Sequence, residues 1–148
     1  MRDLLEDMYV KDIFAKEQKF TYIKENMTLR EFIPIMTDTI QQNFPVVNDG
    51  GEMTGIFSIT DVRDILVDRG LDNLLIMKEI ASDEVPCVNL EDNLAKVLQA
   101  FAEYEVDSLP VVEKEDSRKL LGMIRRRDVI SSYYQKLSTL RMDHTRID

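Results

Sequence analysis

Two short segments of this chain place an aspartate at the predicted start of a helix, a position where a phosphate group could also bind. They are Ser58-Ile-Thr-Asp61 and Arg125-Arg-Arg-Asp128. Each leads into a run with apolar residues at helical spacing, so each aspartate is expected in the first turn of a helix. The free backbone N–H groups and the positive dipole end at such a helix start suit a phosphate. The same pattern is also typical of a simple helix cap, so capping is the alternative.

The two segments differ in a way that bears on this choice. Ser58 can cap a helix, whereas Arg125 at the corresponding position cannot, and yet Asp128 is present. The presence of Asp128 without a capping residue favours a ligand-binding role for this aspartate over a capping role. A first-turn aspartate is, however, also stabilised by the helix dipole. Guanidinium groups pair bidentately with phosphate oxygens, and we predict a phosphate contact for Arg127, which precedes Asp128. For any one of the three arginines the alternative is a solvated helix start.

Both segments belong to an internal duplication. Phe44-Pro-Val-Val47 returns as Leu109-Pro-Val-Val112, and the stretch 55–62 returns as 122–129. The prolines of the two copies are 65 residues apart, and the aspartates are 67 residues apart. A unit of this length is too long for a solenoid repeat and short for an independent domain. The copies are therefore expected to bury their apolar faces against each other as one domain with pseudo-two-fold symmetry, which makes the interface between them the natural cleft.

The elements that position these residues are predicted from apolar periodicity and turn signals. In the first copy we expect a strand at 20–23, a helix capped by Thr28 with apolar positions through Ile40, a hairpin over 44–58 and a helix ending near Gly70. In the second copy we expect a strand near 86–88, a helix over about 93–104, a hairpin over 109–125 with its loop at 114–118, and a last helix through Leu137. Each repeat is predicted to have the element order β-α-β-β-α, so the predicted fold class is α+β. Repeat 1 with its lead-in segment occupies residues 1–74, and repeat 2 with a polar C-terminal tail occupies residues 75–148.

Composition limits the possible functions. The chain is 44% apolar and 32% charged, and it lacks the run of roughly 18 apolar residues that a membrane span needs. Its net charge of −9 opposes binding to nucleic acid. One histidine and one cysteine cannot build a metal site or a catalytic triad, so we predict no enzyme activity and no obligatory cofactor. His144 is expected in a disordered terminus, and Cys87 as a small buried hydrophobe in a reducing, cytosolic setting.

The duplicated motifs resemble a pair of cystathionine-β-synthase-type (CBS) domains. In that family a Pro-Val-Val strand leads through a hairpin to Gly-h-x-Ser/Thr-x-x-Asp at the start of the last helix, where h is apolar. The resemblance runs from about Met8 to Leu137. It implies a tandem CBS pair that binds an adenine nucleotide, AMP, ADP or ATP, in the cleft between the repeats and controls an attached effector.

The resemblance also implies which residues contact the nucleotide. The two aspartates would hold ribose hydroxyls, the helix starts would hold phosphate, and the first strands with the two Pro-Val-Val corners would sandwich the adenine. The nucleotide-binding candidates are Thr21, Tyr22, Ile23, Phe44, Pro45, Ser58, Asp61, Cys87, Leu109, Pro110, Arg127 and Asp128. We expect the cleft that joins Thr21 and Tyr22 to Arg127 and Asp128 to be the better site for a polyphosphate.

The edges of the duplication are similar to the cytoplasmic tails of CLC chloride channels and H⁺/Cl⁻ antiporters. The similar stretches are Leu5-x-x-Met8-x-Val10-Lys-Asp-Ile13 and residues 126–133. This similarity implies a regulatory domain at the inner face of the membrane, attached to the transmembrane domain of a channel or transporter. The chain would then be a fragment of its parent or a free-standing relative.

Two other functions remain open. The pair could be a structural homodimerisation module with empty clefts, because CBS pairs often associate through exposed last helices. It could also be a stand-alone sensor of another transporter or enzyme. The residues expected on a dimer surface are Ile65, Leu66, Ile130, Tyr133 and Tyr134.

Overall fold

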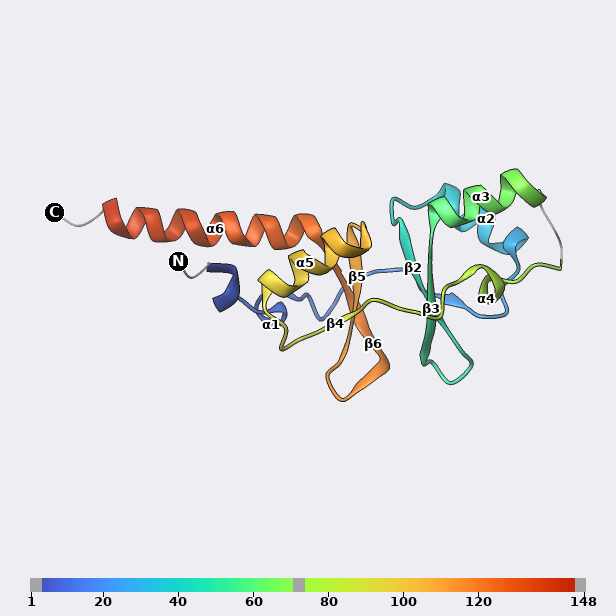
Figure 1. Ribbon diagram of the computed structural model, residues 1–148, viewed down its shortest axis with the longest axis horizontal. Coiled ribbons are helices and arrows are strands. Elements are labelled where there is room, and N and C mark those ends of the chain that lie inside the picture. Colours follow the sequence, from blue (N-terminus) through green and yellow to red (C-terminus); the bar gives the residue numbers. More distant parts are fainter. Residues whose placement is uncertain (1–3, 71–73, 146–148) are drawn as a thin grey trace.

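The two repeats form two α+β halves that lie side by side along the long axis of the molecule (Figure 1). The computed structural model describes residues 4–70 and 74–145, with side chains through residue 141. The first half contains β1 (Ile23–Lys24), α2 (Leu29–Thr37), β2 (Asn43–Val47), β3 (Met53–Ser58) and α3 (Ile59–Arg69). The second contains β4 (Val88–Asn89), α5 (Leu94–Tyr104), β5 (Ser108–Glu113), β6 (Asp116–Arg125) and α6 (Arg126–Thr145). The predicted α+β class and the β-α-β-β-α order of each repeat are confirmed.

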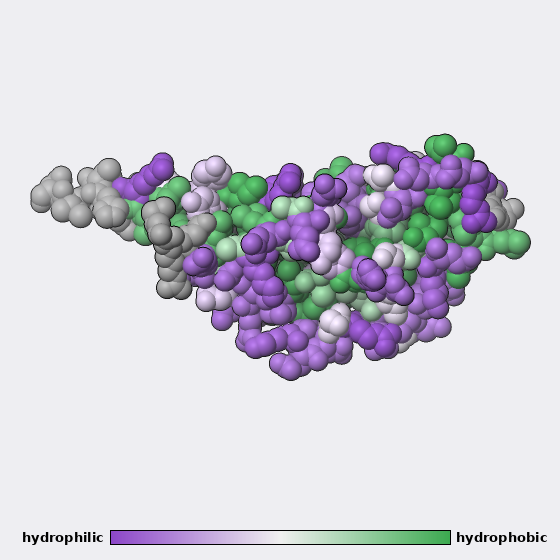
Figure 2. Space-filling model, viewed as in Figure 1, coloured by the Kyte–Doolittle hydropathy of each residue, from purple (hydrophilic) through white to green (hydrophobic). Residues whose placement is uncertain are grey.

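Each half has a three-stranded mixed sheet with matching register. The first strand pairs in parallel with the second, as Ile23 opposite Val46 and Val88 opposite Val111 show. The second and third strands form the predicted hairpins, β2–β3 and β5–β6. Hydrophilic residues cover the hairpins at the bottom of Figure 2.

Local side chains explain where the helices begin. Thr28 caps α2, because its Oγ1 accepts the Glu31 N–H at 3.1 Å while the Glu31 carboxylate accepts the Thr28 N–H at 3.2 Å. Asn93 caps α5 by accepting the Lys96 N–H at 2.9 Å. Gly70 ends α3 with a φ of +67°, a conformation that glycine adopts without strain.

Five predicted boundaries are wrong, among them the strand near 86–88, which runs over Val88–Asn89. The first strand begins at Ile23 instead of residue 20, and α2 ends at Thr37, which leaves Ile40 in a loop with 85% of its surface exposed. The last turn of α2 is tighter than an α-helical turn, because the Asp38 N–H donates a hydrogen bond to the Ile35 carbonyl. The second hairpin turns at residues 114–115, because β6 already begins at Asp116. Helix α6 continues through Thr145, so the segment that contains His144 is helical rather than disordered.

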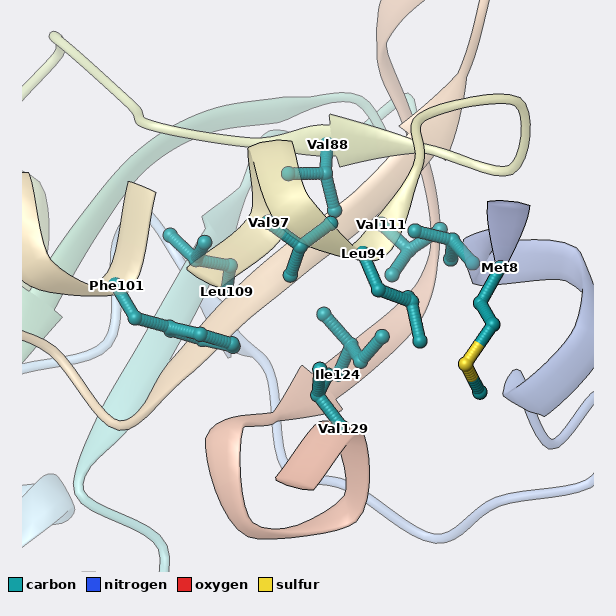
Figure 3. Close-up of a cluster of buried hydrophobic side chains, with 10 residues drawn as sticks. Met8, Val88, Leu94, Val97, Phe101, Leu109, Val111, Ile124 and Val129 are labelled. Atoms are coloured by element: carbon teal, nitrogen blue, oxygen red, sulfur yellow. The ribbon is translucent and has the colours of Figure 1, made fainter. Parts of the chain in front are cut away.

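The apolar residues form two core clusters rather than one shared core. In the first half, Phe32 meets Phe44 and Phe57 edge-on, with ring centroids 5.1 and 5.0 Å apart, and Phe44 stacks on Phe57 at 5.3 Å. The cluster of the second half is drawn in Figure 3. Apolar residues outside both clusters are also buried: Val47, Met53, Val112 and Met123 lie on strands of the two sheets. The sheets contact each other through β2 with β5 and through β3 with β6, so the copies also pack against each other as predicted.

The two lead-in segments are exchanged between the halves. The segment that contains η1 (Leu4–Asp7) and α1 (Val10–Ile13) precedes repeat 1 in the sequence. Met8, labelled in Figure 3, nevertheless belongs to the core of the second half, as does Val10. The Met8 carbonyl accepts the Leu94 N–H at 2.8 Å. Helix α4 (Met77–Ile80) does the reverse, since Met77 is fully buried in the core of the first half. Each repeat thus completes its core with the lead-in of the other.

A buried polar contact joins the repeats near their pseudo-two-fold axis. Asn43 and Ser108 begin the corresponding strands β2 and β5, and both are buried. The Asn43 amide donates to the Asp107 carboxylate at 3.1 Å and to the Ser108 hydroxyl at 3.3 Å. This pairing satisfies polar groups that would otherwise be costly to bury, and it fixes one repeat against the other.

Candidate functional site

A cleft of about 960 Å³ lies where the linker after α1 passes the start of α6. Its walls come from this linker, from the loop before β2, from the start of β5, and from the end of β6 with the first turns of α6. The lining residues used below are Phe14, Gln18, Lys19, Phe20, Thr21, Ile40, Gln41, Asp107, Met123, Arg125, Arg126, Arg127, Asp128 and Ile130. The cleft thus draws on both repeats.

Two glutamines hold the linker in place. The Gln41 side chain accepts the Thr21 N–H at 2.9 Å and donates to the Thr21 carbonyl at 2.7 Å, so it pairs with the backbone like a neighbouring strand. The Gln18 side chain accepts the Met123 N–H of β6 at 2.8 Å and donates to the Ala15 carbonyl at 2.7 Å. These bonds fix the linker at two points and leave its aromatic residues to line the cleft.

Part of the cleft lining is apolar, and these residues are called the apolar wall below. It includes Phe14, Phe20, Ile40 and Ile130. Phe14 can lie against β6 because Gly122 has no side chain, and an added Cβ there would come within 2.7 Å of the ring. Such a wall suits a flat heteroaromatic ring, which gains from burial and from stacking on aromatic side chains.

Another part of the cleft lining is cationic. Lys19 and the three arginines 125 to 127 face only two lining carboxylates, Asp107 and Asp128, in a chain whose net charge is −9. Arg125 pairs with Asp128 at 2.9 Å, and Asp107 accepts from the Asn43 amide. The guanidinium groups of Arg126 and Arg127 have no ion pair among the described residues. Together with the N-terminus of α6, they give this part of the lining an excess of positive charge for an anionic group.

The corresponding position in the other half is arranged differently. Ser58 and Asp61 cap α3 reciprocally: the Ser58 Oγ accepts the Asp61 N–H at 3.1 Å, and the Asp61 carboxylate accepts the Ser58 N–H at 2.9 Å. The linker after α4 lies directly on β3, since Ser82 and Ile56 exchange two backbone hydrogen bonds of 2.9 and 3.0 Å. In the large cleft the side chain of Gln18, rather than the linker backbone, makes the corresponding hydrogen bond to β6.

The predicted nucleotide-binding residues are therefore divided. Thr21, Arg127 and Asp128 line the large cleft, while Ser58 and Asp61 form the cap on the other side. The remaining candidates lie on or near the strands of the two sheets. Ile23, Phe44, Pro45, Leu109 and Pro110 are buried, Cys87 is half-buried, and Tyr22 has 51% of its surface exposed.

Burial decides what several of these side chains contact. Ile23, Phe44 and Leu109 are fully buried within the two cores, so their side chains pack against protein rather than against a ligand.

Burial also raises the pKa of the Cys87 thiol, and the nearby Asp92 carboxylate raises it further, so this cysteine is not activated as a thiolate.

Sequence reasoning missed Phe14, Gln18, Lys19, Ile40 and Gln41. A signal for the linker residues is present in the comparison of the copies. Nine residues separate Ile13 from Ile23, whereas seven separate Ile80 from Val88. The longer linker carries Phe14 and Phe20, and also Gln18, whose side chain joins the linker to β6. For Ile40 and Gln41 the sequence gives no comparable signal, because helical periodicity runs through Ile40.

The duplication matches a known family. A family model described as CBS domain matches residues 10–68 and again residues 77–134. This chain belongs to the CBS domain family. Each matched stretch begins at the first residue of an exchanged lead-in helix, α1 or α4. The predicted tandem CBS pair is thus confirmed.

The curated relatives that match this chain are longer proteins. This CBS pair is 24% identical over 131 residues to a homoserine O-acetyltransferase of Methanococcus vannielii, covering 88% of this chain and 26% of that protein. The chain spans between about a fifth and a half of the curated relatives it matches. No helix in the described part of the chain has the length and hydropathy needed to cross a membrane.

Solved CBS pairs share the fold. A CBS domain pair in complex with 5′-methylthioadenosine and S-adenosyl-L-methionine superposes with a TM-score of 0.69 at 20% identity, covering 87% of this chain and 98% of that one. The protein CBSX2 in complex with AMP gives a TM-score of 0.70 at 19% identity, covering 86% and 97%. At these identities the likeness concerns the fold.

Proposed function

We propose that this CBS pair is a regulatory module that senses an adenine nucleotide, AMP, ADP or ATP, in the cleft between the linker after α1 and the start of α6. The observation that carries the proposal is that the lining of this cleft combines apolar, partly aromatic residues with four cationic side chains. A nucleotide has two matching parts, a flat base and an anionic phosphate. The adenosine compounds bound to the two solved CBS pairs support an adenine base.

The proposed contacts follow the chemistry of the lining. The adenine lies against Phe14, Phe20 and Ile40, and the Asp128 carboxylate accepts hydrogen bonds from the ribose hydroxyls. Arg126, Arg127 and the first N–H groups of α6 hold the phosphates. Because Ser58 and Asp61 satisfy each other and the second linker pairs with β3, we propose one nucleotide per chain.

The effector is a further part of the proposal. The pair itself catalyses no reaction, and bound nucleotide changes the activity of an attached or associated protein. The edge residues 5–13 and 126–133 favour a CLC transporter at the inner face of the membrane as that effector. A homodimer is proposed through α6, which extends beyond the body of the molecule (Figure 1) and exposes Tyr134 and Leu140.

Two matched variants test the location of the site. Asp128→Asn should weaken ATP binding by about 1.5–3 kcal/mol, because the ribose loses charge-assisted hydrogen bonds. The fold should persist, since asparagine is tolerated at helix starts and the exposed Arg125 pair contributes little stability. Asp61→Asn is the control and should leave affinity unchanged. Calorimetric titration of both variants and of the wild type with ATP and GTP measures these effects.

Three other results of this titration would contradict the proposed site. A larger loss at Asp61 than at Asp128 would move the site to the other half of the molecule. Equal wild-type affinity in both variants would contradict nucleotide binding at either aspartate. An absence of heat with ATP at millimolar concentration, confirmed by an unchanged melting temperature, would favour a structural dimerisation module instead.

A further inference from the structure

The two repeats differ in chemistry at one structurally equivalent position beside the cleft. Ser58 and Arg125 each stand three residues after a glycine and immediately before a long helix, α3 or α6. Ser58 turns its hydroxyl to the helix backbone, and Asp61 accepts a backbone N–H in return. Arg125 instead reaches across the first turn of α6 to Asp128.

The arginine occupies both oxygens of the aspartate. Arg125 Nε donates to Asp128 Oδ2 at 2.9 Å, and Arg125 Nη2 lies 3.4 Å from Oδ1. Both side chains are about half exposed, at 49% and 48%, so a ligand in the cleft can reach the pair. A ribose that engages both oxygens of Asp128 competes with the guanidinium for the carboxylate.

This competition has a different result for neutral and for anionic ligands. A nucleoside that displaces Arg125 offers it no new partner, so the ion pair is lost without replacement. A nucleotide brings a phosphate, to which the freed guanidinium can turn while the ribose takes Asp128. Lys19, Arg126 and Arg127 already line the same cleft, so the freed group joins three other cations around the phosphate.

We propose that Arg125 sets the selectivity of this cleft for phosphorylated nucleotides over uncharged nucleosides. This inference rests on the proposed function, because it concerns the same ligand in the same cleft. In it, Arg125 has two roles: it blocks Asp128 when no phosphate is present, and it binds the phosphate when one is.

The test compares adenosine with ATP in the wild type and in Arg125→Ser. Serine is chosen because Ser58 shows that it caps the equivalent helix, so α6 should still form. The wild type should bind ATP more tightly than adenosine. In the variant, adenosine affinity should rise about two- to fivefold as Asp128 becomes free, which is the range of an exposed ion pair. ATP gains the same release of Asp128 but loses one charge-assisted phosphate contact, worth about tenfold, so its affinity should fall about two- to fivefold.

Two further variants separate this role from general electrostatics. Arg126→Ser also removes a cation from the cleft, but its side chain does not pair with Asp128, so ATP should weaken while adenosine stays unchanged. Arg118→Ser removes a cation that pairs with Glu52 at 3.5 Å, on the hairpins and outside the cleft lining, and should leave both affinities unchanged. Circular dichroism of each variant checks that the fold is retained.

The outcomes are distinguishable. A fall of roughly tenfold in the ratio of ATP affinity to adenosine affinity in Arg125→Ser, with a rise in adenosine affinity, supports the proposal. If the wild type binds ATP but Arg125→Ser leaves the ratio unchanged, or lowers ATP affinity without a gain for adenosine, the selectivity role is wrong and the proposed function stands. If the wild type binds neither ligand, both are wrong.

Discussion

Replacing Phe44 with alanine should lower the free energy of unfolding by about 3–5 kcal/mol, the cost typical of deleting a large buried aromatic side chain. Phe44 is fully buried between Phe32 and Phe57, with ring centroids 5.1 and 5.3 Å away. Its removal leaves a cavity in the core of the first half and breaks two aromatic contacts. Urea denaturation followed by circular dichroism measures the change.

The matched control is Phe20→Ala in the wall of the cleft. Phe20 is only half-buried, and its ring centroid lies 6.0 Å from that of Tyr22 outside both cores. We expect this variant to lose less than about 1 kcal/mol of stability and to bind ATP more weakly. The opposite result, a stable Phe44→Ala protein with impaired ATP binding, would show that Phe44 contacts the ligand as the motif resemblance implies.

Val10→Asp should loosen the second half of the molecule, although Val10 precedes the first repeat in the sequence. Val10 is fully buried among Leu94, Val97 and their neighbours. An unpaired carboxylate there costs several kcal/mol, either through its desolvation or through the proton it must take up. Hydrogen exchange should therefore accelerate first in α5, β5 and β6.

Met77→Asp is the reciprocal variant. Met77 precedes the second repeat but is fully buried in the first half, so exchange should accelerate first in α2, β2 and β3. Because the Asn43 contact joins the halves, the effect of each variant can spread, and the order of loss is the informative quantity. If each variant loosens its own repeat first, the exchange of lead-in segments is contradicted.

Most of the secondary structure of this CBS pair is predictable because its signals are local. The Thr28 capping box, the glycine after α3 and the apolar runs that flank polar turns each act within a few residues. The duplication adds independent support, because every element is predicted twice. The end of α2 was missed because Ile40 continues the helical period while the chain has already turned into a loop.

The exchange of lead-in segments could not be predicted from periodicity. The apolar residues of α1 and α4 show that each helix is buried, but they do not show against which sheet. That choice depends on backbone hydrogen bonds between segments far apart in the chain, such as the Leu94 N–H to the Met8 carbonyl.

The candidate site was predictable in part for a similar reason. Thr21, Arg127 and Asp128 are polar residues at strand and helix starts, and the structure brings them to one cleft. Apolar residues of a motif are harder to assign, because a side chain that faces a ligand and one that faces the core look alike in sequence. Phe44 and Leu109 are fully buried, whereas the apolar wall comes from Phe14, Phe20 and Ile40.

Hydrogen exchange of the wild-type chain with and without ATP tests the central claim most directly. Binding in the proposed cleft should slow exchange in three segments that line it: the linker 13–21, the loop 39–42 and the first turns of α6 at 126–131. The start of α3, with Ser58 and Asp61, should exchange at an unchanged rate and serves as the internal control. Slower exchange at the start of α3, or no change in any of these segments at saturating ATP, would contradict an adenine nucleotide site in this cleft.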